Sequence, residues 1–148
     1  MVFTHYLPEE EYFVPLGIAD VKREGADVTV IATMMMVHKA LNAAKQLSAD
    51  GIDVEVIDPR TLVPLDKDTI ISSAKKTGRV IVASEDTKTA GVAAELAAMI
   101  SEEAFDHLDA PVKRICALDT PIPYSPILEG KMIPQDYDII TAVKEIVR

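Results

Sequence analysis

Short apolar runs alternate along this chain with longer segments in which apolar residues recur every three or four positions. The first run, Val28–Thr33, is rich in β-branched residues, which is typical of a buried strand. Apolar residues then recur at helical spacing between positions 37 and 47, and Gly51 supplies a stop signal. The pattern predicts a strand followed by a helix, with Thr33 as the residue that caps the helix.

The same alternation continues to the end of the chain. Asp66 is suited to cap a second helix, and Gly78 is suited to end it. A proline-rich segment from Pro121 to Pro134 is predicted to be a loop. The other predicted elements are strands at 54–57, 79–83 and 112–117 and helices at about 91–105 and 139–147.

Strands that alternate with helices predict right-handed βαβ crossovers and a largely parallel sheet with helices on both faces. The fold class is therefore α/β, a three-layer α/β/α sandwich. The first 25 residues differ, because a polar, acidic start is followed by an apolar segment broken by Pro15 and Gly17. We expect an extended arm there, with a short edge strand within residues 19–24.

Composition narrows the class of protein. The length of 148 residues suits one domain, and 49% hydrophobic with 26% charged residues is an ordinary globular mixture. A single cysteine excludes an intrachain disulfide and favours a reducing compartment. No apolar run reaches the roughly 18–20 residues that span a bilayer, and the start lacks signal-peptide features. We therefore expect one cytoplasmic domain.

Charge and motifs exclude several functions. The net charge of −9 disfavours nucleic acid and anionic membranes as partners and is compatible with a basic protein partner. The sequence contains no P-loop, no dinucleotide fingerprint after the first strand and no nucleophile elbow. His5, His38 and His107 lie apart without ligand spacing, so we expect no metal site. These residues alone predict an α/β domain without its own catalytic groups.

Three other features carry chemical interest. Met34–Met36 and Glu85–Asp86 each follow a strand end, where open α/β sheets place binding sites. Packing at the helix entry is the preferred interpretation of the methionines, and a solvated loop or a helix cap that of the acidic pair. Cys116 lies in an apolar strand, so we expect an inert core thiol whose pKa burial raises.

Four segments, read together in order and spacing, resemble a known family. They are Val14–Gly25 with Asp27–Val30 directly after it, Asp58–Asp66, Ala104–Val112 and Asp119–Pro126. They resemble the carboxy-terminal domain of the beta subunit of thiamine-diphosphate-dependent 2-oxo acid dehydrogenases. Pyruvate, branched-chain and acetoin dehydrogenases share that subunit, and the domain is also the last domain of transketolase-like enzymes. The resemblance extends from about Leu7 to the end of the chain.

The resemblance implies a mixed five-stranded sheet with one antiparallel strand. Residues 14–148 would form the domain, and residues 1–13 would be the linker from a domain that binds the aminopyrimidine of the cofactor and carries the catalytic groups. An alpha subunit would hold the diphosphate and Mg²⁺. The domain would thus contain no cofactor, metal or catalytic residue and would be inactive alone, although it belongs to an oxidoreductase.

The resemblance also implies partner surfaces. Asp109, with Asp106 nearby and the carboxyl terminus at Arg148, matches a patch that faces a small basic binding domain of the dihydrolipoyl acyltransferase. Asp109 could instead only start the turn into the last strand. Ile122, Tyr124 and Ile127 are candidates for an apolar interface with a second beta subunit, so the isolated domain is expected to form a homo-oligomer.

Several further positions carry alternative interpretations. Arg60 is expected to be structural, with a place at the mouth of the assembled active site as the alternative. The motif at 124–126 favours pyruvate or acetoin over branched-chain substrates. Thr87–Gly91 has fewer glycines than the family pattern, and Ala93 stands where a second glycine is expected. The rival function is a stand-alone α/β small-molecule-binding or regulatory module that uses the strand ends near Met34, Arg60 and Glu85.

Overall fold

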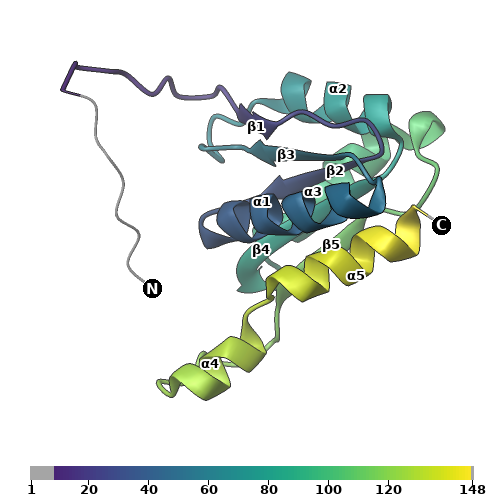
Figure 1. The fold of residues 1–148 in the computed structure, drawn as a ribbon. Coiled ribbons are helices and arrows are strands. Elements are labelled where there is room, and N and C mark those ends of the chain that lie inside the picture. The colour runs from purple at the N-terminus through teal and green to yellow at the C-terminus, as the bar shows by residue number, and fades with distance from the viewer. Residues whose placement is uncertain (1–8, 148) are drawn as a thin grey trace.

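The computed structural model describes residues 9–147, and these form a sheet covered by helices on both faces (Figure 1). The strands lie in the order β1-β3-β2-β4-β5. Strand β1 pairs antiparallel with β3, and the other three pairings are parallel. The strands are β1 (Asp20–Arg23), β2 (Val28–Ala32), β3 (Val54–Asp58), β4 (Val80–Thr87) and β5 (Lys113–Ala117). The predicted mixed five-stranded sheet, with its edge strand near residue 20, is confirmed.

Five α-helices and two short 3₁₀ turns connect or follow these strands. The helices are α1 (Met35–Leu47), α2 (Lys67–Thr77), α3 (Val92–Glu103), α4 (Pro126–Met132) and α5 (Asp136–Ile146), and the turns are Ser48–Asp50 and Phe105–His107. Within residues 9–147, no helix is long and apolar enough to cross a membrane.

Two separate cores make the three layers. Val28, Val30 and Ala32 of β2 share a buried cluster with α1 and α5, whereas Ile31 of the same strand packs with α2 and α3. Side chains of successive strand residues point to opposite faces, so one fully buried strand contributes to both cores. This explains why β2 is apolar throughout instead of alternating with polar residues.

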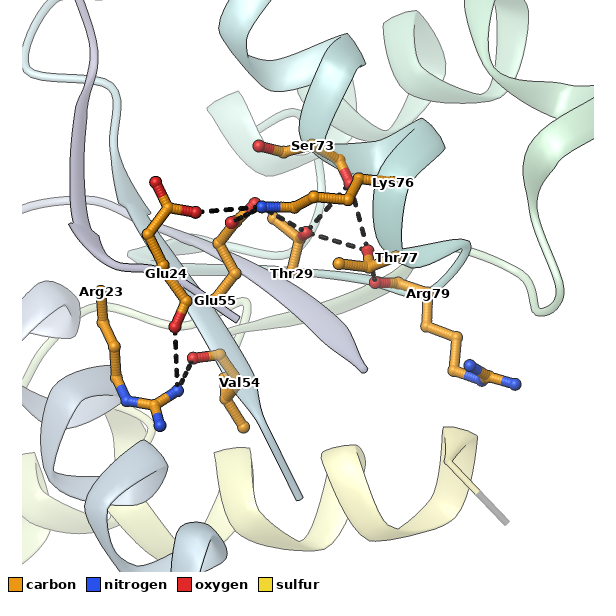
Figure 2. A network of polar contacts seen from close by, with 9 residues as sticks. All are labelled: Arg23, Glu24, Thr29, Val54, Glu55, Ser73, Lys76, Thr77 and Arg79. Atoms are coloured by element: carbon orange, nitrogen blue, oxygen red, sulfur yellow. Dashed lines mark hydrogen bonds and ion pairs between the residues drawn. The ribbon is translucent and has the colours of Figure 1, made fainter. Parts of the chain in front are cut away.

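A polar network joins α2 to the amino-terminal edge of the sheet (Figure 2). Glu55 of β3 is fully buried and forms an ion pair with Lys76 of α2, whose ammonium also contacts Glu24 at 3.1 Å. The Thr29 hydroxyl lies 2.9 Å from the Thr77 hydroxyl and donates to the Glu55 carboxylate at 3.4 Å. Each buried polar group therefore has a partner, which removes most of the cost of burying it.

Local signals give the expected boundaries of α2. The Asp66 carboxylate accepts hydrogen bonds from the Thr69 N–H at 3.2 Å and the Thr69 hydroxyl at 2.8 Å. Gly78 ends the helix in the left-handed conformation with φ 65°. The prediction that Asp66 is a structural N-cap is confirmed.

Two predictions of local structure were wrong. Thr33 does not cap α1, because the backbone turns sharply at Met34 (φ 50°), and the Thr33 hydroxyl donates to Ser84 at 3.4 Å instead. The segment predicted to be a proline-rich loop contains helix α4, with Pro126 at its first turn. Proline lacks an N–H, but a first-turn N–H has no partner within the helix, so proline starts a helix without loss.

Candidate functional site

The candidate site is a cavity of about 370 Å³ at the carboxyl ends of β2, β3 and β4. Strands β2 and β4 are neighbours, but the chain leaves β2 towards β3 on the other side, so the strand order reverses at this point. Open α/β sheets bind ligands in the crevice at such a reversal. The cavity is lined by Thr33, Met34, Asp58, Pro59, Arg60, Leu62, Ser84, Glu85, Asp86 and Val92.

Backbone strain is concentrated at this edge. Among the described residues, the non-glycine residues with positive φ are Met34 (φ 50°), Arg60 (φ 58°) and Ala90 (φ 59°), and each follows the carboxyl end of a strand. Such conformations cost about 1–3 kcal/mol each and persist where the surrounding structure or function requires them. The strained residues therefore lie at the carboxyl edge of the sheet, which is also the edge where the reversal of strand order predicts a binding site.

Met34 departs from the predicted packing role. Its side chain is 79% exposed, whereas Met36, two residues later, is fully buried in the core with α1 and α5. Packing at the helix entry was thus right for Met36 and wrong for Met34. Nothing in the local sequence signals a methionine with positive φ, so sequence reasoning had no means of singling out Met34.

Arg60 has a structural bond and also lines the cavity. The Arg60 guanidinium forms an ion pair with Asp20 of β1 at 2.6 Å, and the Arg60 backbone N–H donates to the Asp58 carboxylate at 2.9 Å. The Lys22 ammonium, bonded to Asp20 at 2.5 Å, and Arg60 together lower the pKa of Asp20. The ion pair between Arg60 and Asp20 links the loop after β3 to the edge strand β1. Arg60 therefore has the structural role that was predicted for it.

The acidic pair at the end of β4 stabilises two helices. Glu85 accepts a hydrogen bond from the Met35 N–H at the start of α1, at 3.3 Å. Asp86 accepts one from the Val92 N–H at the start of α3, at 3.1 Å. Carboxylates at helix amino termini satisfy free N–H groups and oppose the helix dipole. These bonds agree with the helix-cap interpretation of the pair.

The glycine-poor loop after β4 still forms a tight turn. Ala90 adopts positive φ, and a Cβ on Gly91 would lie 2.2 Å from the Thr87 carbonyl oxygen. Only glycine fits at 91, so the one glycine that the loop retains is at the position that requires it. Ala93 is fully buried in α3.

A second feature is the α4 segment, which consists of residues 122–132 and includes helix α4. Helix α4 extends away from the sheet and its covering helices (Figure 1). No residue of α4 is buried. The three predicted interface residues all lie exposed on this segment: Ile122, Tyr124 and Ile127, of which Tyr124 is fully exposed and Ile127 is 75% exposed. Between α1 and the α4–α5 segment lies a groove of about 870 Å³. Lys39 lines this groove, and its ammonium donates to the Pro134 carbonyl at 2.5 Å.

The predicted docking residues lie at the opposite, amino-terminal edge. The Asp109 N–H donates to the Gly78 carbonyl at 2.7 Å, and its carboxylate pairs with Arg79 at 3.2 Å. Asp106 is exposed in the 3₁₀ turn just before it. Arg148 lies outside the described residues. The ion pair between Lys113 of β5 and Glu145 of α5 brings the end of α5 to this same edge.

Cys116 is less buried than predicted. Its strand β5 is at the edge of the sheet, so the thiol is only partly buried and lines a third cavity. Burial raises the pKa of the Cys116 thiol above its usual value, as expected.

Comparisons with known proteins agree with this architecture. Residues 17–139 match the family described as "Transketolase, C-terminal domain". The chain is 47% identical over 140 residues to the beta subunit of acetoin:2,6-dichlorophenolindophenol oxidoreductase of Bacillus subtilis, covering 95% of this chain and 41% of that protein. It is 47% identical over 144 residues to the pyruvate dehydrogenase E1 component subunit beta of the same organism, covering 97% and 44%.

Other similarities extend the picture. The 2-oxoisovalerate dehydrogenase subunit beta of Bacillus subtilis is 45% identical over 141 residues, with 95% of this chain and 43% of that protein covered. A solved structure of a split gene transketolase, an inactive beta4 tetramer, matches with a TM-score of 0.75 at 30% identity over 96% of this chain and 44% of that one. The chain spans about two fifths of the length of the curated relatives that it matches. By its matched residues and its fold, the chain belongs to the transketolase carboxy-terminal domain family.

Proposed function

We propose that this chain is the carboxy-terminal domain of the beta subunit in the decarboxylating component of a pyruvate, acetoin or related 2-oxo acid dehydrogenase. Its own work is subunit assembly and docking of the acyltransferase, and bond breaking takes place elsewhere in the enzyme. The similar beta subunits named pyruvate dehydrogenase and acetoin oxidoreductase support this proposal. The similar tetramer supports an oligomeric assembly.

The observation that carries the assembly role is the exposed apolar surface of the α4 segment. This segment presents Ile122, Tyr124, Ile127 and Leu128 to solvent, although large apolar side chains gain about 1.5–3 kcal/mol each on burial. A projecting helix with no buried residue is stabilised when another subunit covers it. We assign this surface to contact with a second beta subunit, and we assign neighbouring surfaces to the alpha subunit.

The cofactor belongs to the assembled enzyme in this proposal. Among the residues that the structure describes, no three His, Cys, Asp or Glu side chains gather in a way that could hold a metal ion. Thiamine diphosphate and Mg²⁺ would be held by other parts of the enzyme, with residues 1–13 as the linker and Arg60 near the mouth of the site.

Sedimentation of the chain tests the assembly role. The wild type is expected to associate, and the triple change Ile122→Ser, Tyr124→Ser, Ile127→Ser is expected to give a monomer. The matched control is Phe105→Ser, which removes another exposed apolar side chain from the other edge of the sheet. A monomeric wild type, or dissociation by the control as complete as by the triple variant, would contradict the assignment.

A second candidate function is a stand-alone small-molecule-binding module. The cavity of about 370 Å³ at the carboxyl ends of β2, β3 and β4, which we call the carboxyl-edge cavity, favours this function. It is lined by Met34 and Arg60, whose backbones are strained. The two functions differ in a calorimetric titration of the isolated chain with 2-oxo acids and with thiamine diphosphate plus Mg²⁺. The assembly role predicts no tight binding of either, whereas a stand-alone module predicts tight binding of a small molecule at this edge.

A further inference from the structure

A cavity of about 400 Å³ lies beside the carboxyl end of β5, between that strand and the start of α5. It shares no lining residue with the carboxyl-edge cavity. Three cationic side chains line it, and each comes from a different segment: Lys88 follows β4, Arg114 belongs to β5 and Lys131 to α4. Segments distant in sequence therefore place positive charge at one location.

These cations have no ion-pair partners in the described part of the chain. Eight of the lysines and arginines form ion pairs with carboxylates. Six others within residues 9–147 do not, and three of those six line this one cavity. A chain with a net charge of −9 has ample carboxylates for pairing, so the concentration of unpaired cations here is a local excess.

The two carboxylates that line the cavity are occupied by hydrogen bonds within the chain. Asp119 accepts from the N–H of Thr89 at 3.0 Å and from its hydroxyl at 2.5 Å, and these bonds lower the pKa of Asp119. Asp138 accepts from the Gln135 N–H at 2.7 Å. One guanidinium nitrogen of Arg114 donates to the Lys88 carbonyl at 2.7 Å, which fixes this side chain at the cavity. Three cations thus face two carboxylates that already have partners.

We propose that this cavity binds a small phosphorylated anion. The volume lies at the lower end of the usual range for small-molecule sites. Guanidinium and ammonium groups form strong, charge-assisted hydrogen bonds with phosphate oxygens, and several cations together favour ligands of more than one negative charge. The inference does not depend on the proposed function: Lys131 lies on α4, but none of the apolar side chains assigned to the subunit interface lines this cavity.

Cys116 provides a reporter within the cavity. It is the single cysteine of the chain and lines the cavity. Burial raises its pKa, and the positive charges of Arg114 and Lys88 oppose that rise, so both cations act on the thiol. A bound anion would offset these charges and cover the sulfur, and both effects slow alkylation because the thiolate is the reactive form.

The test measures the rate of iodoacetamide alkylation of the 148-residue chain against inorganic pyrophosphate at constant ionic strength. A saturable, several-fold slowing is expected. The double change Lys88→Gln, Lys131→Gln removes two exposed side chains and is expected to weaken the apparent affinity about tenfold or more, because it removes two of the three cations that line the cavity. Lys75→Gln, an unpaired lysine of α2 outside the cavity, is the matched control and should leave the affinity unchanged.

Circular dichroism and sedimentation of each variant separate a loss of binding from a loss of folding or assembly. Mg²⁺ is expected to weaken the effect of pyrophosphate, because it neutralises the anion. Three results would overturn the proposal: no saturable slowing, an equal loss of affinity in Lys75→Gln, or slowing that requires Mg²⁺.

Discussion

Met34 shows at the scale of one residue how strain and exposure coincide. Its backbone has φ 50° and ψ −124°, a conformation that glycine adopts readily. Met34 is largely exposed and contributes little to core packing. Met34→Gly is therefore expected to raise the free energy of unfolding by about 1 kcal/mol in urea denaturation. Met35→Gly, at the first residue of α1, is the control and should not raise it, because Met35 has no positive φ for glycine to relieve. A destabilised Met34→Gly would mean that the side chain contributes more than its exposure suggests.

Glu55 and Lys76 form the residue pair whose loss should be most damaging. Lys76→Met leaves the fully buried Glu55 carboxylate without its partner. The expected loss of unfolding free energy is about 3 kcal/mol, at the lower end for buried pairs because Lys76 is partly exposed. Arg79→Met, which breaks the exposed pair with Asp109, is the matched control and should cost no more than about 1 kcal/mol.

The same pair gives a pH dependence. A hydrogen bond to Glu55 raises the pKa of Lys76 above its usual value of about 10.4. When the folded-state pKa of a lysine is raised, the added stability is fully present below the unfolded-state pKa. It is lost as the pH rises from there through the folded-state pKa. Urea denaturation should therefore show stability falling above about pH 10 in the wild type, and falling less steeply in Lys76→Met. Equal slopes would exclude this linkage.

At the scale of elements, Asp66 links the edge strand to α2. Its carboxylate caps the helix through Thr69 and also accepts the Ala19 N–H at 2.9 Å, just before β1. Burial would raise the pKa of Asp66, but the bonds from Ala19 and Thr69 lower it overall. Asp66→Ala is expected to lower the free energy of unfolding by about 0.5–2 kcal/mol.

The lowered pKa of Asp66 also predicts where this contribution disappears. A lowered folded-state pKa adds stability above the unfolded value of about 3.9, and that stability is lost as the pH falls through the folded pKa. The stability difference between the wild type and Asp66→Ala should thus narrow below about pH 4. A difference that stays constant into acid would show that the charge of Asp66 plays no part.

Sequence reasoning succeeded for elements whose signals are local. The order of strands and helices, the Asp66 cap and the Gly78 stop could all be predicted from neighbouring residues. Helix α4 was missed because the closely spaced prolines at 121, 123 and 126 favour a loop, although proline in a first turn, as at Pro126, is a helix-start signal. The strain at Met34 has no local signal, since it arises from how the end of β2 meets α1.

At the scale of the whole molecule, the candidate sites depend on strand order, which the residue pattern does not contain. Lys88, Arg114 and Lys131 meet because β4 and β5 are neighbours and the last residues of α4 lie beside the end of β5, where the Met132 carbonyl accepts from the Leu118 N–H at 3.2 Å. Spacing along the chain does not indicate this meeting. The proposed sites lie at two opposite edges of the sheet. The carboxyl edge carries the strained cavity, and the amino edge carries Asp106 and Asp109, the acidic residues proposed for docking.

Docking of the acyltransferase is a prediction for the assembled dehydrogenase. Asp109→Asn is expected to weaken binding of the basic binding domain and to flatten its salt dependence, because carboxylates steer and hold a basic partner. Asp68→Asn, exposed at the start of α2, is the matched control. Equal affinities and salt slopes for wild type and Asp109→Asn would leave Asp109 as a turn residue that pairs with Arg79.

Hydrogen exchange on the α4 segment tests the assembly role most directly. Backbone amides of residues 128–132 would be followed in the isolated chain at low concentration and in the enzyme assembled from alpha and beta subunits. We predict exchange at least about tenfold slower in the assembly, with the exposed face of α2 unchanged, because covering α4 suppresses its local opening. Equal exchange of α4 in both states would contradict the claim that this surface is a subunit interface.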